Sequence, residues 1–126
     1  MAASHILVVD DDAQVLGLFL KVLAGRGYTV TGTTCGRDVI DMAVNAPYDL
    51  AIVDLSMPDV GGFEILKTLR ARSPYMKIVV VSGAMPGLML ESARIFGATS
   101  TLNKPVSPET LIAAVADALQ GTRAAS

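Results

Sequence analysis

The sequence predicts an α/β domain built on a doubly wound parallel sheet. Short, unbroken apolar runs rich in β-branched residues alternate along the chain with segments of helical periodicity, and the pattern repeats over nearly all of the 126 residues. Parallel strands have this appearance because helices cover both faces of their sheet. Five predicted strands and five predicted helices favour an open sheet of order 2-1-3-4-5 over a closed barrel, which needs more units.

The first predicted strand is the apolar run at residues 6–9, and an amphipathic helix is expected to follow it. The apolar stripe of this helix is predicted from its helical spacing to consist of Val15, Leu18, Phe19, Val22 and Leu23. Gly25 and Gly27 are predicted to end the helix, and residues 28–33 are predicted to form an extended strand.

The middle of the chain repeats this unit of a strand followed by a helix. We expect a helix over residues 36–46, which Pro47 ends, and a strand over residues 50–53. After the glycine pair at 61–62, apolar residues at helical spacing predict a third helix: Phe63, Leu66 and Leu69.

The last third contains a predicted strand at 78–81, a helix at 88–96 and a short strand at 100–102. A final helix is expected to begin with Ser107 as its N-cap and Pro108 at its first position. Its apolar stripe is Leu111, Ile112, Val115 and Leu119. We therefore expect a single domain over residues 1–126, with a core of about residues 4–120 and a short tail at 121–126.

Composition excludes several function classes. With 52% hydrophobic residues and a formal net charge of −2, the chain is neither disordered nor a strongly basic nucleic-acid binder. Its apolar runs are too short to cross a bilayer and no signal peptide is visible, so we expect a cytoplasmic protein without a membrane partner. The single cysteine, Cys35, excludes an intrachain disulfide, and together with the single histidine, His5, it makes a zinc site implausible.

Polar residues follow four of the strands, at the sheet edge where doubly wound folds bind ligands. They are Asp10, Asp11 and Asp12 after the first strand, Asp54 after the third, Ser82 after the fourth and Lys104 after the fifth. Crowded carboxylates either take up protons or bind a divalent cation, and oxygen ligands in an open site suit Mg²⁺. A lysine is suited to a phosphoryl oxygen, so the set is typical of a phosphoryl-transfer site. Taken alone, Asp12 is best explained as the N-cap of the first helix.

The order and spacing of these motifs resemble the receiver domain of two-component response regulators over nearly the whole chain. The resemblance is carried by the runs at 6–12 and 54–58, by Gly61, by Ser82–Gly83 and by Lys104–Pro105. It implies a flavodoxin-like fold in which Asp54 accepts a phosphoryl group from a histidine kinase or a histidine phosphotransfer protein. It also implies that Mg²⁺ (or Mn²⁺) is held by Asp10, Asp11, Asp54 and the backbone carbonyl of Ser56.

The resemblance further implies how the domain switches. Lys104 would contact the acceptor carboxylate and then the phosphate, and Pro105 would follow a cis peptide bond. Ser82 would swing toward the phosphoryl group and change the face formed by the fourth helix, the fifth strand and the fifth helix. Relatives commonly carry an aromatic residue where this chain has Thr101, so we expect that face to respond weakly or differently. Ser56 and Ala84 are small, so we expect water to reach the phosphoryl group.

On this interpretation the chain is a signalling module and not an enzyme, beyond accepting its own phosphoryl group and losing it again. Its further partners would be a downstream protein or an effector domain outside this chain, and the resemblance also allows a homodimer on phosphorylation. The alternative is a small phosphatase of the haloacid-dehalogenase type, with Asp10 as nucleophile and Asp12, Ser82 and Lys104 in the other roles. The order of its motifs disfavours it. A receiver-like docking protein that no longer accepts phosphate is a third hypothesis.

Overall fold

A single parallel sheet forms the centre of the molecule. The structure is a computed structural model that describes residues 3–45, 47–55, 62–83, 92–95 and 97–125. Its five strands lie in the order β2-β1-β3-β4-β5, and every neighbouring pair is parallel. The strands are β1 (His5–Val9), β2 (Thr29–Thr33), β3 (Leu50–Asp54), β4 (Lys77–Ser82) and β5 (Ser100–Asn103). The predicted sheet order is confirmed.

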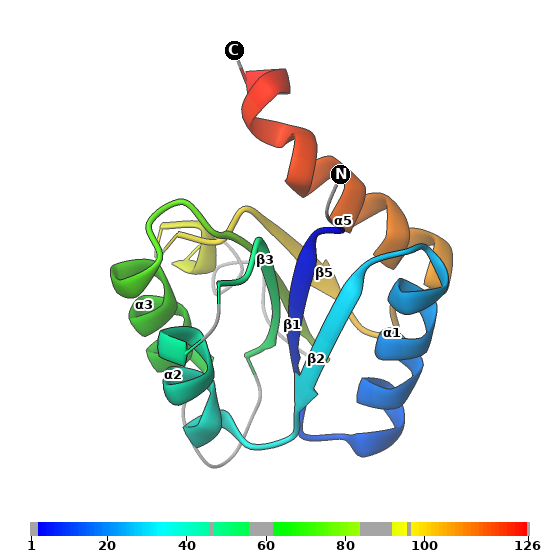
Figure 1. Ribbon diagram of the computed structural model, residues 1–126, viewed down its shortest axis with the longest axis horizontal. Helices are drawn as coiled ribbons and strands as arrows, with labels where there is room; N and C mark the ends of the chain where they lie inside the picture. The colour runs from blue at the N-terminus through cyan, green and yellow to red at the C-terminus, as the bar shows by residue number, and fades with distance from the viewer. Residues whose placement is uncertain (1–2, 46, 56–61, 84–91, 96, 126) are drawn as a thin grey trace.

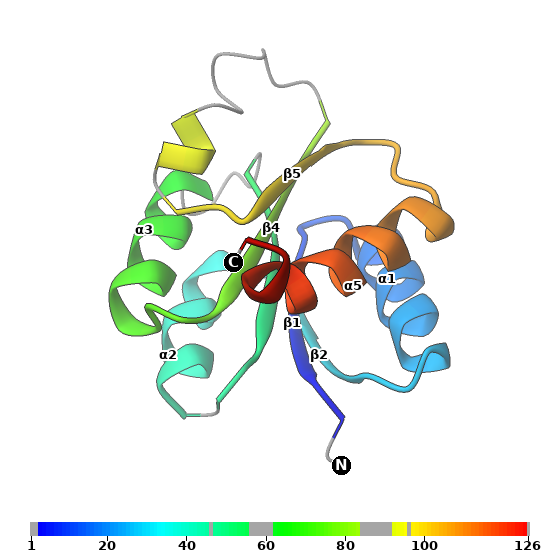
Figure 2. The same ribbon diagram turned by 90° about the horizontal axis from the view of Figure 1, so that it is seen from above.

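Helices cover both faces of this sheet (Figure 1). They are α1 (Ala13–Gly25), α2 (Gly36–Asn45), α3 (Gly62–Arg72) and α5 (Pro108–Ala125). α1 and α5 pack on one face, and α2 and α3 pack on the other, as Figures 1 and 2 show. Of the helix predicted at 88–96, residues 92–95 are helical, and the others lie outside the described residues.

The central strands divide their side chains between two cores because successive residues of a strand point to opposite faces. In β1, Leu7 and Val9 pack with α2 and α3, whereas Ile6 and Val8 pack with α1 and α5. All five residues of β3 are buried. Strands buried on both faces account for the unbroken apolar runs in the sequence.

The apolar face of α1 differs from the prediction. Leu18, expected on the buried stripe, is 46% exposed, whereas Leu16 is buried beside Phe19 and Leu23. The sequence of α1 has apolar residues on more than one side of the helix, so the side that is buried depends on the neighbour of the helix in the fold. That neighbour is Gly32 of β2, where a Cβ atom would lie 2.8 Å from Leu16 Cδ1. The helix therefore approaches β2 closely through Leu16.

The helix ends follow local chemistry. Gly27, after α1, has a φ of 93°, a conformation that glycine adopts without strain. At α5 the Thr110 N–H donates to Ser107 Oγ at 3.1 Å, which confirms the predicted N-cap. The buried stripe of α5 includes Leu111 and Val115, as predicted. The helix continues to Ala125, so residues 121–125, expected to be a tail, are helical.

This architecture places the carboxyl ends of all five strands at one edge of the sheet, since the strands are parallel. No helix among the described residues is long and apolar enough to span a bilayer.

Candidate functional site

Two buried carboxylates lie side by side at this edge. β1 and β3 are adjacent and in register, with Val9 opposite Val53, so the next residues along the two strands are neighbours. These are Asp10 and Asp54, which are 1% and 2% exposed. Burial of two acidic groups at one point is costly unless they are compensated.

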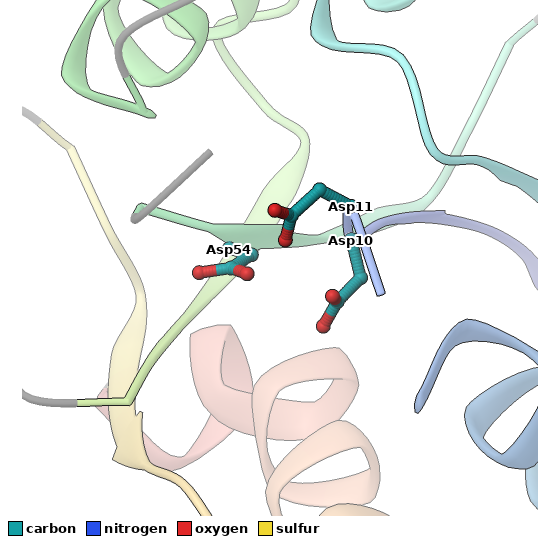
Figure 3. A group of neighbouring side chains, drawn as sticks. All are labelled: Asp10, Asp11 and Asp54. Carbon is teal, nitrogen blue, oxygen red and sulfur yellow. The ribbon is translucent and has the colours of Figure 1, made fainter. Parts of the chain in front are cut away.

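A third carboxylate, Asp11, joins them from the exposed side. One carboxylate oxygen from each of Asp10, Asp11 and Asp54 lies within 4.8 Å of the others. Figure 3 shows the three side chains around a common space beyond the ends of β1 and β3. The structure thus brings together the three acids that the resemblance assigns to the metal.

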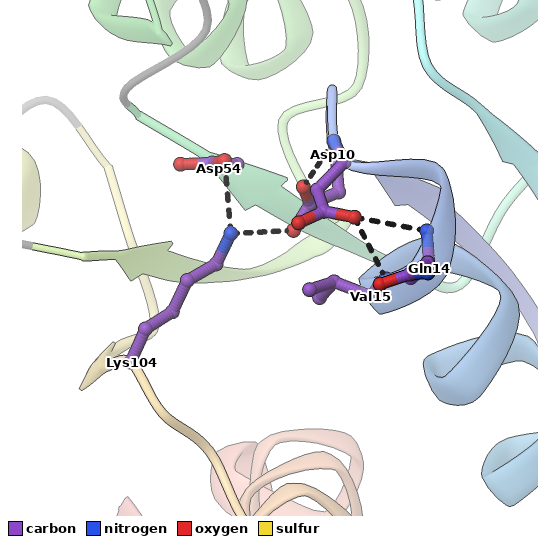
Figure 4. Close-up of polar contacts among 6 residues, drawn as sticks. Asp10, Gln14, Val15, Asp54 and Lys104 are labelled. Carbon is purple, nitrogen blue, oxygen red and sulfur yellow. Dashed lines mark hydrogen bonds and ion pairs between the residues drawn. The ribbon is translucent and has the colours of Figure 1, made fainter.

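Lys104 bridges the two buried acids. Its Nζ lies 2.8 Å from Asp10 Oδ2 and 3.1 Å from Asp54 Oδ2 (Figure 4). The backbone N–H of Lys104 donates to the Ser82 carbonyl at 2.8 Å, and the Lys104–Pro105 peptide bond is cis. The lysine therefore enters the site directly from the end of β5, which pairs with β4.

Burial and pairing oppose each other in the protonation of these groups. Burial raises the pKa of Asp10 above its ordinary value, although the Lys104 ammonium and the Asp12 N–H both stabilise the charged form. For Lys104, burial alone would lower the pKa, but hydrogen bonds and charge from Asp10 and Asp54 outweigh it and raise the pKa. Lys104 therefore stays protonated at neutral pH and serves as the counter-charge of the two buried acids.

The remaining predicted residues have varied positions. Ser82 ends β4 and is 2% exposed, with Asn103 opposite it in β5. Thr101 is half-buried in β5, opposite Val80. The predictions for Ser56 and Ala84 fall outside the described residues.

Asp12 directly follows Asp10 and Asp11 in the sequence, but its side chain bonds the first turn of α1. Its Oδ1 accepts hydrogen bonds from the N–H groups of Gln14 at 2.9 Å and Val15 at 3.3 Å, so it caps α1, as predicted. The Asp12 N–H in turn donates to Asp10 Oδ1 at 2.9 Å. The phosphatase alternative needs a free Asp10 nucleophile beside an available Asp12 carboxyl. With Asp10 bonded through both oxygens and Asp12 used as a cap, the structure does not favour it.

The sequence did not reveal the direct contact between Lys104 and Asp10, which is the shorter of the two ion pairs. The spacing of the motifs does not predict this contact, because it depends on how far the lysine side chain reaches from β5 past the ends of β4 and β3. The ammonium compensates one negative charge, so the three carboxylates together keep an excess of negative charge at this edge of the sheet.

The donor set fits a hard divalent cation. Carboxylate oxygens are the ligands that Mg²⁺ prefers, and Mg²⁺ commonly uses one or two carboxylates while sharing a phosphate. The three acids and Lys104 together carry the same charge as the formal net charge of the chain, −2. A divalent cation at this point would offset that charge.

Comparison with known proteins gives a consistent result. The family model of the response regulator receiver domain matches residues 6–116. The cell cycle response regulator CtrA of Brucella ovis is 31% identical over 112 residues, which cover 88% of this chain and 48% of that protein. The chain spans about half the length of the curated relatives it matches.

Solved structures agree with the fold. A CheY-like receiver domain protein from Methanospirillum hungatei superposes with a TM-score of 0.92 at 27% identity, covering 98% of this chain and 99% of that one. A response regulator from Burkholderia pseudomallei, solved with a phosphorylated aspartic acid, a calcium ion and citrate, gives a TM-score of 0.84 at 25% identity. That match covers 96% of this chain and 71% of the Burkholderia chain.

Proposed function

The chain belongs to the response regulator receiver domain family of two-component systems, and from this premise we propose that it accepts a phosphoryl group on Asp54. The donor is a phosphohistidine of a histidine kinase or of a histidine phosphotransfer protein. The observation that carries the proposal is the convergence of Asp54 with Asp10, Asp11 and Lys104 at the carboxyl ends of β1, β3 and β5.

In the proposed reaction a carboxylate oxygen of Asp54 attacks the phosphorus atom of the donor. The new oxygen–phosphorus bond converts Asp54 to an acyl phosphate. The bond that breaks joins phosphorus to the imidazole nitrogen of the donor, and this nitrogen leaves with the electron pair. Catalysis of this kind depends on positioning and charge compensation, which this site is built to supply. The domain acts once on itself and then loses the group by hydrolysis, so it is not an enzyme acting on a separate substrate.

Asp10, Asp11, Asp54 and the backbone carbonyl of Ser56 would hold Mg²⁺. The ion would supply positive charge to the oxygens of the transferred phosphoryl group. The Burkholderia relative, which was solved with a phosphorylated aspartic acid and a calcium ion, supports a divalent cation and an acyl phosphate in this fold.

Lys104 compensates Asp10 and Asp54 before the reaction. Once Asp54 carries a phosphoryl group, the strongest negative charge lies on the phosphoryl oxygens, and the ammonium moves to them. Ser82, buried at the end of the neighbouring strand, responds to the same oxygens. These changes alter β5, α5 and the segment between β4 and β5, where a downstream protein or an effector domain would bind.

The test is incubation with acetyl phosphate and Mg²⁺, followed by intact-mass measurement. We expect one phosphoryl adduct on the wild type and none on Asp54→Ala. The matched control is Asp41→Ala, which removes an exposed carboxylate of α2 outside the site. An adduct of equal yield on Asp54→Ala, or no adduct on the wild type, would refute the proposal.

A further inference from the structure

Arg70, in the last turn of α3, is bonded to two separate backbone segments, residues 73–76 and Gly97. Its Nη1 donates to the carbonyl oxygens of Pro74 at 2.8 Å and Met76 at 2.7 Å, with a longer contact of 3.4 Å to Ser73. Its Nη2 donates to the Gly97 carbonyl at 2.6 Å. One guanidinium thus ties the end of α3 and the start of β4 to the turn that precedes β5.

This side chain is not a surface charge. It is half-buried, its burial lowers the pKa of the guanidinium, and no carboxylate pairs with it among the residues that the structure describes. Gly97 has a φ of 111°, and a Cβ atom there would lie 2.7 Å from Arg70 Nε. The approach therefore depends on a glycine at the turn, and carbonyl oxygens take the place of an acidic partner.

The turn at Gly97 leads directly into β5, a short strand with a weak hold on the core. β5 has four residues, lies at the edge of the sheet and has no fully buried side chain. The hydroxyl of its first residue, Ser100, is buried without a hydrogen-bond partner among the described residues, and such a group costs about 1–3 kcal/mol. Besides its pairing with β4, its position therefore depends on what holds its two ends.

The two ends of this strand are fixed by two cationic side chains. At the carboxyl end, Lys104 reaches Asp10 and Asp54. At the amino end, Arg70 fixes Gly97, and two residues later the Thr99 N–H donates to the Ile78 carbonyl at 2.7 Å. Figure 2 shows α3 and the helical residues 92–95 on the same side of the sheet, so α3 is placed to serve as the support.

We propose that Arg70 is a positioning residue for phosphorylation: by fixing the turn at Gly97 it sets the position of β5, and thereby that of Lys104 over the carboxylates. This role rests on the proposed phosphorylation of Asp54. Arg70 contacts neither the phosphoryl donor nor the acceptor and acts only through the strand.

The proposal separates two properties of the site. Mg²⁺ binding uses acids from β1 and β3, which Arg70 does not hold, whereas the transfer rate also depends on Lys104. We expect Arg70→Met to slow phosphorylation by acetyl phosphate about tenfold, below the roughly 100-fold that a misplacement of about 1 Å can cost. We expect Arg70→Met to bind Mg²⁺ at least as tightly as the wild type in calorimetry, because the acids from β1 and β3 keep their places.

A double-mutant cycle tests the route through Lys104. In the Lys104→Met background, adding Arg70→Met should leave the transfer rate unchanged, because the residue that Arg70 positions is already gone. The matched control is Arg72→Met, which removes an exposed arginine from the same turn of α3. This control should phosphorylate at the wild-type rate.

Hydrogen exchange provides a measure that does not depend on phosphorylation. The amides of Ala98 and Thr99 donate to Ala93 and Ile78. Both should exchange faster in Arg70→Met than in the wild type or Arg72→Met. If Arg70→Met does not fold, Arg70→Lys provides the same tests. Lysine keeps the charge but offers a single donor nitrogen in place of Nη1 and Nη2, which make the bonds to the backbone.

Each outcome is decisive. Wild-type phosphorylation of Arg70→Met, a rate loss that multiplies with that of Lys104→Met, or a parallel loss of Mg²⁺ affinity would overturn the role of Arg70 and leave the proposed function standing. Absence of any adduct on the wild type would overturn the proposed function and the role of Arg70 with it.

Discussion

Replacing Lys104 with methionine tests the electrostatic design of the site most directly. The change keeps much of the side-chain volume and removes the cation that contacts both Asp10 and Asp54. Deleting one partner of a buried ion pair costs about 3–5 kcal/mol because the other partner stays buried and uncompensated. The acids are 1% and 2% exposed, but the Lys104 side chain is 20% exposed, so solvent screens part of the interaction. We expect a loss at the low end, about 3 kcal/mol.

Mg²⁺ should reverse part of this loss. Without the Lys104 ammonium, Mg²⁺ meets no positive charge among the three carboxylates. The affinity of Lys104→Met for Mg²⁺ should therefore be about tenfold higher than that of the wild type, which corresponds to about 1.4 kcal/mol. At a concentration about 100 times its dissociation constant, an ion stabilises the protein that binds it by about 2.7 kcal/mol. Mg²⁺ should therefore stabilise Lys104→Met more than the wild type at the same concentration.

The assay is urea denaturation followed by circular dichroism, once with a chelator and once with saturating Mg²⁺. Lys21→Met is the matched control, since it removes an exposed lysine of α1 away from the site. Wild-type stability of Lys104→Met in the chelator would refute the compensating role of the ammonium. A smaller stabilisation by Mg²⁺ in the variant than in the wild type would refute the competition between the lysine and the cation.

Three further predictions follow from single contacts. Asp12→Ala should lower stability by about 1 kcal/mol because the α1 cap is lost, but the variant should still be phosphorylated. Loss of the phosphoryl adduct in this variant would contradict the assignment of Asp12 as a cap. Gly32→Ala places a Cβ atom 2.8 Å from Leu16 Cδ1, at the end of a leucine side chain that can shift, so it should cost about 1 kcal/mol in chemical denaturation, at the low end for overpacking. Gly17→Ala, in open space within the same helix as Leu16, should instead stabilise by about 0.5–1 kcal/mol, and equal effects would refute the packing argument. Ser82→Ala should still accept a phosphoryl group but show a smaller change in the hydrogen exchange of β5 on phosphorylation, and an unchanged response would refute its role in the switch.

The sheet and most of the site could be predicted because Asp10 and Asp54 lie at the ends of strands that are buried on both faces, and Lys104 directly follows the short strand β5. Asp10, Asp54 and Lys104 each occur at the end of an apolar run or close to one. Parallel strands deliver their carboxyl ends to one edge, so the topology converts positions far apart in the chain into neighbours. The order of apolar runs and polar residues along the chain is therefore enough to assemble these groups.

Other features depend on tertiary partners that leave no periodic signal. Leu16 and Leu18 are equally apolar, but Leu16 is the one that α1 packs toward the sheet, next to Gly32 of β2. Arg70 is similar: an arginine near the end of a helix is ordinarily a solvated charge, and its acceptors here are backbone carbonyls, which every residue carries. Contacts to the main chain are therefore the ones that sequence patterns reveal least.

Lys104 connects the chemistry of the site to the position of β5. Its single ammonium holds Asp10 at 2.8 Å and Asp54 at 3.1 Å, and under the proposed function it is also the group that meets the new phosphoryl oxygens. Those oxygens would lie farther out than the carboxylate to which they are attached, so the ammonium would loosen its contact with Asp10 as it follows them. The backbone N–H of Lys104 is bonded to Ser82, and the opposite end of β5 is fixed at Gly97 by Arg70. Under the two proposals, a change at one end of the strand would be taken up within β5 and its two attachments, and the strength of the attachment at Arg70 would determine how far it spreads.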